Sequence, residues 1–346
     1  MPRSNATSKE FPSFPLVDLH AHLGASVSPT TYWEIAHEQG FKLPERDYHR
    51  FIEYITLSDK RKMGLKEYFD TIYHPLLDPL SSGTFACETA TFEIMSGAYR
   101  SSGISLIELR NNPMKHNHGG QEDLDHIIMA MLRGMEKALL QYPTLRAGLI
   151  FCMDRQFSFE KNAIIVEKAI KYRRRGVVGI DLANYYPPKG FSIKNYRPLI
   201  QRARRAGLKI TIHSGENADS DDLWEVVEYL QPDRIGHGIR AAYDKKLMKR
   251  LIQKNIVLEV CPMSNIATKA VENFDELSHC IKTLKEHKVR FTINTDWPEM
   301  IEEAHLNNQF AMLRKQNILN ESDLRECVRT SLAATFVPKG GLNAYL

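Results

Sequence analysis

Two histidines placed two residues apart are the first residues of the chain that suggest chemistry. His20 and His22 follow the short apolar run 14–17, which is typical of a strand. Alternate side chains of a strand point to the same face, so both imidazoles would lie together. Two neutral imidazoles that converge on one point make half of a zinc site. Taken alone, the pair is equally well explained as two ordinary histidines at a strand end.

Further residues able to bind a metal stand at the ends of other strand-like runs. His213, His237 and Asp296 each follow such a run. Three neutral imidazoles and one carboxylate can hold a zinc ion and leave room for a water, whose pKa the metal lowers toward neutrality. Our predicted ligands are His20, His22, His213 and Asp296.

Two residues near these ligands are candidates for moving protons. Glu216 lies three residues beyond His213, and Gly215 between them permits a tight turn that could direct the carboxyl back to the site. Buried there, the carboxyl could act as a general acid, whereas a loop carboxylate considered alone is more often solvated. His237 has a glycine on each side and is a natural base beside a metal-bound water.

Strand and helix patterns alternate along most of the chain. Seven apolar runs follow the opening one, at 104–109, 147–152, 177–182, 208–213, 234–237, 256–260 and 289–294. Amphipathic helical patterns lie between them. Eight strands alternating with helices predict an α/β fold, a (β/α)8 TIM barrel, in which chemistry gathers at the C-terminal ends of the strands.

The remaining segments complete this expected domain. Residues 41–80 show helical patches and no convincing strand, which predicts a helical insertion between the first two strands, lying over the barrel mouth as a cap. The tail from about 304 is helical. We expect residues 1–346 to form a single hydrolase barrel domain.

Composition argues against several other classes of protein. The chain has 346 residues, of which 43% are hydrophobic and 25% charged, with a formal charge of +4. These proportions are ordinary for a soluble globular protein, and the charge is too small to indicate nucleic-acid binding. No apolar run is long enough to cross a membrane. We therefore expect a small-molecule substrate, with no nucleic-acid or membrane partner; no oligomeric state is predicted.

The five cysteines are widely spaced and contain no C-x-x-C pair. Neither a disulfide framework nor a thiolate zinc site is indicated, and reduced thiols favour the cytoplasm. The polar segment 1–10 does not have the pattern of a signal peptide.

Six short motifs together resemble the adenosine deaminase family of metal-dependent hydrolases. They occur in the family's order and at its approximate spacing, over about residues 15 to 335. The motifs are VDLHAHL at 17–23, GIDLA at 179–183, HSGE at 213–216, RIGHG at 234–238, CPMSN at 261–265 and NTD at 294–296.

The resemblance implies a mechanism and a role for each residue. The four predicted ligands would hold one Zn²⁺ per chain, since the fourth strand lacks the lysine that bridges two metals in related amidohydrolases. Glu216 would protonate the ring nitrogen beside the attacked carbon, and His237 would orient and deprotonate the attacking water. Metal-bound hydroxide would add to the amine-bearing carbon, and ammonia would leave.

Three positions depart from family members that act on adenosine. Those members carry an aspartate that meets the ribose 5′-hydroxyl, where this chain has Gly24. They carry a glycine whose N–H meets the purine, where this chain has Asn184, and an aspartate that binds the five-membered ring, where it has Trp297. Trp297 could stack on a ring or simply pack the barrel rim. Because a lost hydrogen-bond partner can cost large discrimination, we expect adenosine to be a poor substrate.

The sequence therefore predicts a zinc-dependent hydrolytic deaminase of an aminated purine nucleoside, base or related N-heterocycle. Two alternatives remain: hydrolysis of another C–N bond, as in a cyclic amide or substituted amine, and a non-catalytic relative that only binds a ligand. Retention of both Glu216 and His237 argues against the last, because a binding module needs neither. The donor set would also accept divalent ions other than zinc.

Overall fold

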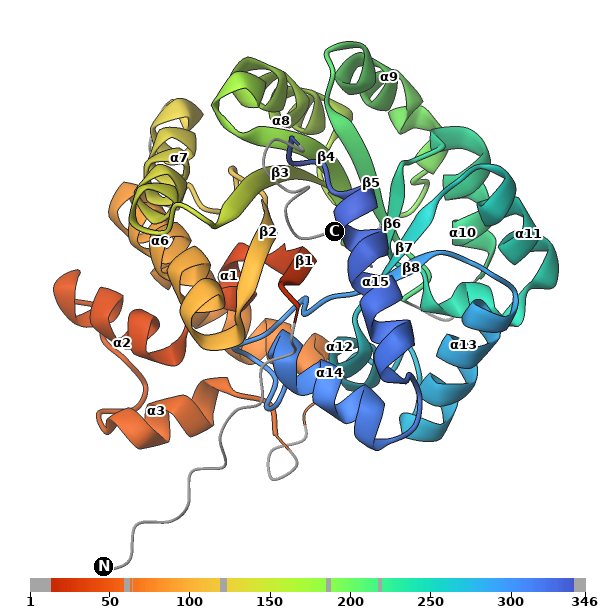
Figure 1. Ribbon diagram of the computed structural model, residues 1–346. Coiled ribbons are helices and arrows are strands. Elements are labelled where there is room, and N and C mark those ends of the chain that lie inside the picture. The colour runs from red at the N-terminus through yellow and green to blue at the C-terminus, as the bar shows by residue number, and fades with distance from the viewer. Residues whose placement is uncertain are drawn as a thin grey trace, which may run out of the picture.

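A barrel of eight parallel strands forms the centre of the molecule. The computed structural model describes residues 14–58, 63, 65–118, 123–184, 188–216 and 220–338. Each strand pairs in parallel with the next along the chain, and helices surround the strands (Figure 1). The strands are β1 Leu16–His22, β2 Ile104–Asn111, β3 Arg146–Asp154, β4 Val177–Ala183, β5 Lys209–Ser214, β6 Arg234–His237, β7 Val257–Val260 and β8 Phe291–Ile293. The predicted (β/α)8 barrel is confirmed.

The strands are apolar because both of their faces are covered. In β3, successive residues Leu149, Ile150 and Phe151 are all fully buried, as expected of a parallel strand between a barrel interior and a layer of helices. A few strand positions instead carry charged side chains that are equally buried, among them Asp181 in β4 and Glu259 in β7. These exceptions lie beneath the candidate site.

Most helices follow the strands in the order expected, and several begin at recognisable caps. Ser28 accepts a hydrogen bond from the Thr31 amide at the start of α2, with Pro29 in the first turn. The helices between β1 and β2 are α1 Leu23–Ser26, α2 Pro29–Glu38, α3 Tyr48–Ile55, α4 Leu65–Tyr68, η1 Phe69–Leu77, α5 Asp78–Leu80 and α6 Gly83–Ser102. The later ones are α7 Leu124–Gln141, α8 Phe159–Tyr172, η2 Arg173–Arg175, η3 Ile193–Tyr196, α9 Arg197–Arg205, α10 Ser220–Glu225, η4 Val226–Leu230, η5 Ile239–Tyr243, α11 Lys245–Gln253, α12 Pro262–Ala267, α13 Phe274–Glu286, α14 Leu306–Lys315 and α15 Glu321–Ala334.

The barrel closes where the residues after β8 meet the end of β1. The Asp296 amide donates to the His20 carbonyl at 2.7 Å, and the His22 amide donates to the Asp296 carbonyl at 3.1 Å. Just before this point, the Asn294 side-chain oxygen accepts from the Leu19 amide at 3.0 Å. Closure of the barrel therefore places Asp296 directly beside the two histidines of β1.

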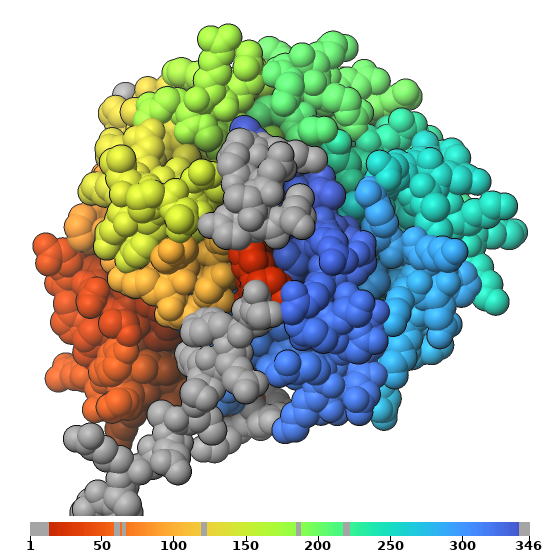
Figure 2. Space-filling view, viewed as in Figure 1, coloured from red at the N-terminus to blue at the C-terminus, as the bar shows by residue number. Residues whose placement is uncertain are grey.

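The segment between α2 and α6 contains α3, α4, η1 and α5, with residues 59–62 and 64 outside the described ones. It docks on the loop after β8 through a backbone hydrogen bond from Leu57 to the Met300 carbonyl, at 2.8 Å. At the other end of the chain, α15 crosses the face seen in Figure 2, where the start of β1 shows as a small red area. Within the described ranges, no helix is both long and apolar enough to cross a membrane.

Candidate active site

The four predicted ligands bring their donor atoms to one point. His22 Nε2 lies 3.0 Å from His213 Nε2, and His20 Nε2 and His22 Nε2 each lie 3.3 Å from Asp296 Oδ1. A tetrahedral ion bound at about 2.0–2.1 Å requires donor atoms separated by about 3.3 Å. The spacing therefore fits a small divalent cation without rearrangement.

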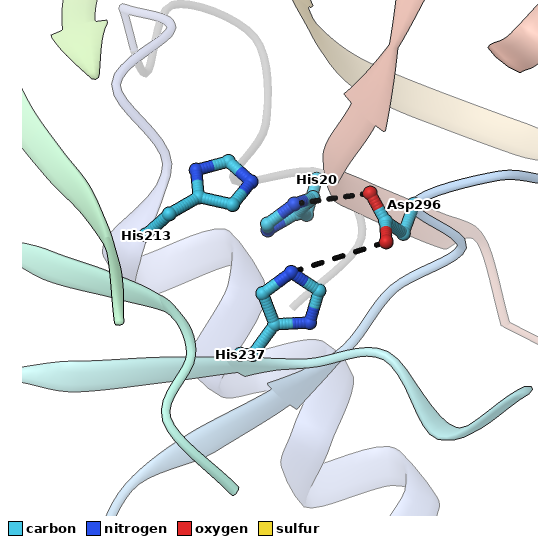
Figure 3. Close-up of side chains that lie close together, drawn as sticks. All are labelled: His20, His213, His237 and Asp296. Atoms are coloured by element: carbon cyan, nitrogen blue, oxygen red, sulfur yellow. Dashed lines mark ion pairs between the residues drawn. The ribbon is translucent and has the colours of Figure 1, made fainter. Parts of the chain in front are cut away.

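His237 stands next to this point. Its ring belongs, with His20, His213 and Asp296, to a buried group whose possible ligand atoms lie within 4.8 Å of one another. Figure 3 shows the three rings and the carboxylate directed toward a common space. His237 Nε2 is 3.9 Å from Asp296 Oδ2, against 3.3 Å for the closest histidine contacts of that carboxylate. Its place is at the edge of the donor set.

Carboxylates behind the rings fix which nitrogen faces the site. His20 Nδ1 lies 2.8 Å from Glu259 Oε2, and His213 Nδ1 lies 2.7 Å from Asp181 Oδ2. With Nδ1 donating its proton to a carboxylate, Nε2 keeps a free lone pair, which is the usual arrangement behind a metal-binding histidine. Apart from the ion-pair contacts within the donor set, His20 Nε2 and Asp296 Oδ1 are buried without a hydrogen-bond partner among the described residues. A bound cation would satisfy both atoms.

Burial keeps two of the predicted ligands, His213 and His22, in the neutral form that binds a cation. It lowers the pKa of His213 to about 4 against the opposing attraction of Asp181, and it holds the pKa of His22 well below its usual value. Burial alone would raise the pKa of Asp296, but the hydrogen bond and charge of His20 outweigh it and lower that pKa. Near neutral pH the donor set therefore includes neutral imidazoles and a carboxylate.

A buried ionic network supports the histidines from below. Arg110 donates to Glu259 at 2.7 Å and to Asp181 at 2.9 Å, and Arg234 donates to Glu259 at 2.6 Å. Burial would raise the pKa of Glu259, but the two arginines and His20 hold it well below its usual range. Since Glu259 binds two guanidinium groups and a ligand imidazole, its position sets the position of His20.

Glu216 and His237 form a close pair beside the donor set. His237 Nε2 is 2.8 Å from Glu216 Oε2, and both side chains are buried. Apart from this contact, neither Glu216 oxygen has a hydrogen-bond partner among the described residues. On the other side of the ring, His237 Nδ1 lies 3.0 Å from the Asn265 side-chain amide. A buried carboxylate with unused acceptor positions is suited to exchanging a proton with a substrate.

Two residues of the site adopt a backbone conformation that residues other than glycine rarely take. The φ angles are +61° at His237 and +65° at Asp296. Left-handed conformations at residues other than glycine carry strain and cluster at functional sites. Ser264 helps to hold Asp296, because its hydroxyl donates to Oδ2 at 2.6 Å.

A cavity of about 470 Å³ opens above the donor set, and His22 and His213 are among the residues that line it. One side carries the aromatic rings of Phe69, Tyr73 and Trp297. The other side carries polar groups from the ends of β2 to β4, namely Lys115, Asp154, Gln156 and Asn184. The cavity is therefore amphipathic, and its volume suits a small molecule.

All three positions singled out for substrate binding line this cavity. Gly24 faces Tyr73, and Trp297 packs edge-on against Phe69 with ring centres 5.0 Å apart. Asn184 has a φ of +82°, and its amide nitrogen lies 3.1 Å from Asp154 Oδ1. This contact turns the Asn184 side-chain amide toward Asp154.

Several supporting residues were given no role from the sequence. Asp181, Glu259 and Asn265 hold the site histidines, although Asp181 and Asn265 belong to motifs quoted above. The available signal was a carboxylate inside an otherwise apolar strand, which is costly unless it is paired.

The chain is similar to known proteins both in sequence and in fold. The family model described as adenosine deaminase matches residues 15–345. An adenosine deaminase of Clostridium kluyveri is 30% identical over 332 residues, which cover 95% of this chain and 91% of that protein; one of Shewanella denitrificans is 29% identical over 329 residues, covering 94% and 95%. The solved structure of an adenine deaminase from Arthrobacter aurescens superposes with a TM-score of 0.82 at 22% identity, covering 96% of this chain and 97% of that one.

Proposed function

The chain belongs to the adenosine deaminase family of hydrolytic deaminases, and on that premise we propose that it releases ammonia from an aminated purine nucleoside, base or related N-heterocycle. The observation that carries the proposal is the convergence of four donor atoms, 3.0 to 3.3 Å apart where measured, beside the Glu216 and His237 pair. A domain that only bound a ligand would have no use for an orphaned carboxylate next to a metal site.

The proposed metal is one Zn²⁺, held by His20, His22, His213 and Asp296. Imidazole and carboxylate donors at tetrahedral spacing suit zinc, although the same set accepts other divalent ions. When bound, zinc would lower the pKa of a water toward neutrality and so supply the nucleophile.

The protein's own side chains perform the proton transfers. Glu216 delivers a proton to the ring nitrogen beside the attacked carbon, which increases that carbon's electrophilicity. His237, held by Asn265, orients the attacking water and accepts its proton. Burial of both side chains excludes bulk water from these proton transfers.

We propose that Gly24, Asn184 and Trp297 contact the substrate, and that adenosine is a poor one. Relatives named adenosine deaminase and a structural neighbour named adenine deaminase make nucleosides and free bases the first compounds to test. We also propose one domain over 1–346, with 41–80 as an insertion. A cytoplasmic location is supported by five cysteines that are all free and buried.

The test is ammonia release from the zinc-loaded protein with adenosine, adenine, adenosine monophosphate, N6-substituted adenines, guanine, cytosine derivatives and aminopteridines. Glu216→Gln serves as the control, because it keeps the four ligands and removes the acid. We expect at least one compound to be turned over, and the variant to lose about 10²- to 10⁴-fold in rate. An undiminished rate of turnover in Glu216→Gln, or no ammonia from any compound, would contradict the proposal.

A further inference from the structure

A tyrosine from the inserted segment occupies the space that a side chain at position 24 would need. Gly24 lies in α1, two residues after the proposed ligand His22, and lines the cavity. A Cβ added at Gly24 would lie 2.1 Å from the Tyr73 hydroxyl oxygen. Glycine is therefore required at position 24 while Tyr73 holds this place, and the two residues form one structural unit.

Tyr73 is held in place by its neighbours. It lies in η1, and its phenol hydrogen-bonds to the Asp78 carboxylate, which also accepts from His74 Nδ1 at 3.0 Å. Burial and the charge of Asp78 raise the pKa of Tyr73, so the phenol keeps its proton and donates it to that carboxylate. The Tyr73 hydroxyl proton is therefore used in the hydrogen bond to Asp78 and is not available to a ligand.

The surface next to Tyr73 is aromatic. Its ring lies nearly parallel to that of Trp297, at 25° and 6.2 Å between centres, and Phe69 packs edge-on against both. Trp297 is only 7% exposed, so only a small part of its ring surface is accessible. Such a wall favours a flat ring or an alkyl group.

The charged groups that line the cavity are largely engaged with one another or with Tyr73. Lys115 Nζ is 2.6 Å from Asp154 Oδ2, and the Asn184 amide lies against Oδ1 of the same carboxylate. A hydroxyl placed against Gly24 would lose its water, and the carboxylate beside Tyr73, that of Asp78, already accepts from Tyr73 and His74. Burying an unpaired hydroxyl is unfavourable, whereas an apolar group of similar size is not penalised.

We propose that Tyr73 is a specificity-determining residue, and that the part of the substrate facing Gly24, Tyr73 and Trp297 is apolar and carries no hydroxyl group. The substrate class is an aminated heterocycle that is unsubstituted on this side or bears an alkyl or deoxygenated substituent. This inference rests on the proposed deaminase function and adds the identity of the group beside position 24.

Two pairs of compounds that differ by one hydroxyl test the proposal: 5′-deoxyadenosine against adenosine, and 9-ethyladenine against 9-(2-hydroxyethyl)adenine. We expect kcat/KM for ammonia release to favour the compound without the hydroxyl by at least tenfold in whichever pair is turned over. Tyr73→Phe should keep this preference, because the ring remains. Tyr73→Ala should reduce it at least fivefold, since water can then solvate the hydroxyl. Tyr229→Ala, which changes an exposed tyrosine of η4, should leave it unchanged.

A second measurement separates failure of this inference from failure of the deaminase proposal. Titration calorimetry with Glu216→Gln protein measures binding of the same compounds without turnover, and the same preference is expected in Kd. Differential scanning calorimetry shows whether Tyr73→Ala is folded, because a folded protein gives an unfolding transition. A preference for the hydroxylated compounds, equal affinities, or a preference that Tyr73→Ala leaves intact would overturn the inference. Absence of ammonia with the binding preference retained would overturn only the deaminase activity.

Discussion

At the scale of single residues, Glu259 shows how one buried carboxylate can organise a site. It accepts from Arg110 and Arg234 and holds His20 through Nδ1. Glu259→Gln removes the charge that both guanidinium groups share. We expect metal affinity to fall about 10- to 100-fold, because the ligand imidazole loses its partner. The free energy of unfolding should fall by about 3–5 kcal/mol, because two buried cations lose a counter-charge.

Metal affinity is measured by competition with a chromophoric chelator, and stability by urea unfolding. Glu228→Gln is the matched control, since Glu228 pairs with Arg250 on the surface, where such a pair contributes about 0–1 kcal/mol. An unchanged metal affinity in Glu259→Gln would show that Glu259 does not position His20.

His213 gives the metal-free protein a pH-dependent stability. Its pKa is about 4 in the folded state and near 6.5 when unfolded. Between these values the unfolded chain binds the extra proton, so the free energy of unfolding falls as the pH falls from 6.5 to 4. The difference corresponds to about 3 kcal/mol. Urea unfolding of chelator-treated protein at pH 7, 5.5 and 4 should show this loss, and His213→Gln should show a flatter profile. Parallel profiles for the two proteins would contradict the account.

Sequence patterns were sufficient to select the residues whose side chains the structure brings together, because their types and strand-end positions are local information. Their partners were harder to assign. Arg110 pairs with Asp181 of β4 and Glu259 of β7, two strands distant from its own in the sequence. The side-chain direction of Asn184 depends on Asp154 in a different strand. Contacts of this kind arise only when distant strands are brought together.

At the scale of elements, Gly179 lets the chain's C-terminal segment pack closely against β4. A Cβ at Gly179 in β4 would lie 2.8 Å from the Phe336 ring and 2.8 Å from the Lys209 carbonyl of β5. We expect Gly179→Ala to lower the free energy of unfolding by about 1–3 kcal/mol through overpacking. Denaturant unfolding measures the change.

Gly97→Ala is the control for this substitution. Gly97 lies inside α6 with no atom near its added Cβ, so alanine there should stabilise the protein by about 0.5–1 kcal/mol. If both variants are equally stable, close packing at Gly179 does not constrain the barrel.

All eight strands could be predicted because each is a continuous apolar run, and their alternation with helices allows few topologies. The sequence indicated where helices lie between the first two strands, but not how their side chains pack. Its helical patches gave no register, so nothing in the sequence placed Tyr73 against Gly24 or Phe69 against Trp297. The absence of a side chain at position 24 was visible, whereas its cause lies about fifty residues further along the chain.

At the scale of the whole molecule, the proposed metal site joins parts of the chain that are far apart in sequence. Its proposed ligands come from β1, β5 and the turn after β8, the same junction that closes the barrel. An ion that binds only the folded state should therefore stabilise the entire fold. At a free zinc concentration of 1,000 times Kd the gain is about 4 kcal/mol.

We expect chelation to lower Tm by several degrees and zinc to restore it. Differential scanning calorimetry makes the comparison, and Asp296→Ala should abolish the response. A Tm that does not depend on metal would argue against a bound ion held by these residues.

The central claim is that this site hydrolyses a C–N bond and releases the exocyclic amine as ammonia. The most direct measurement is turnover of the best compound in ¹⁸O-labelled water, with ammonia quantified and the product examined by mass spectrometry. The account predicts one ammonia and one ¹⁸O atom in the heterocyclic product per turnover, with both lost in Glu216→Gln. A ring-opened product without ammonia, or ammonia without incorporation of label, would contradict it.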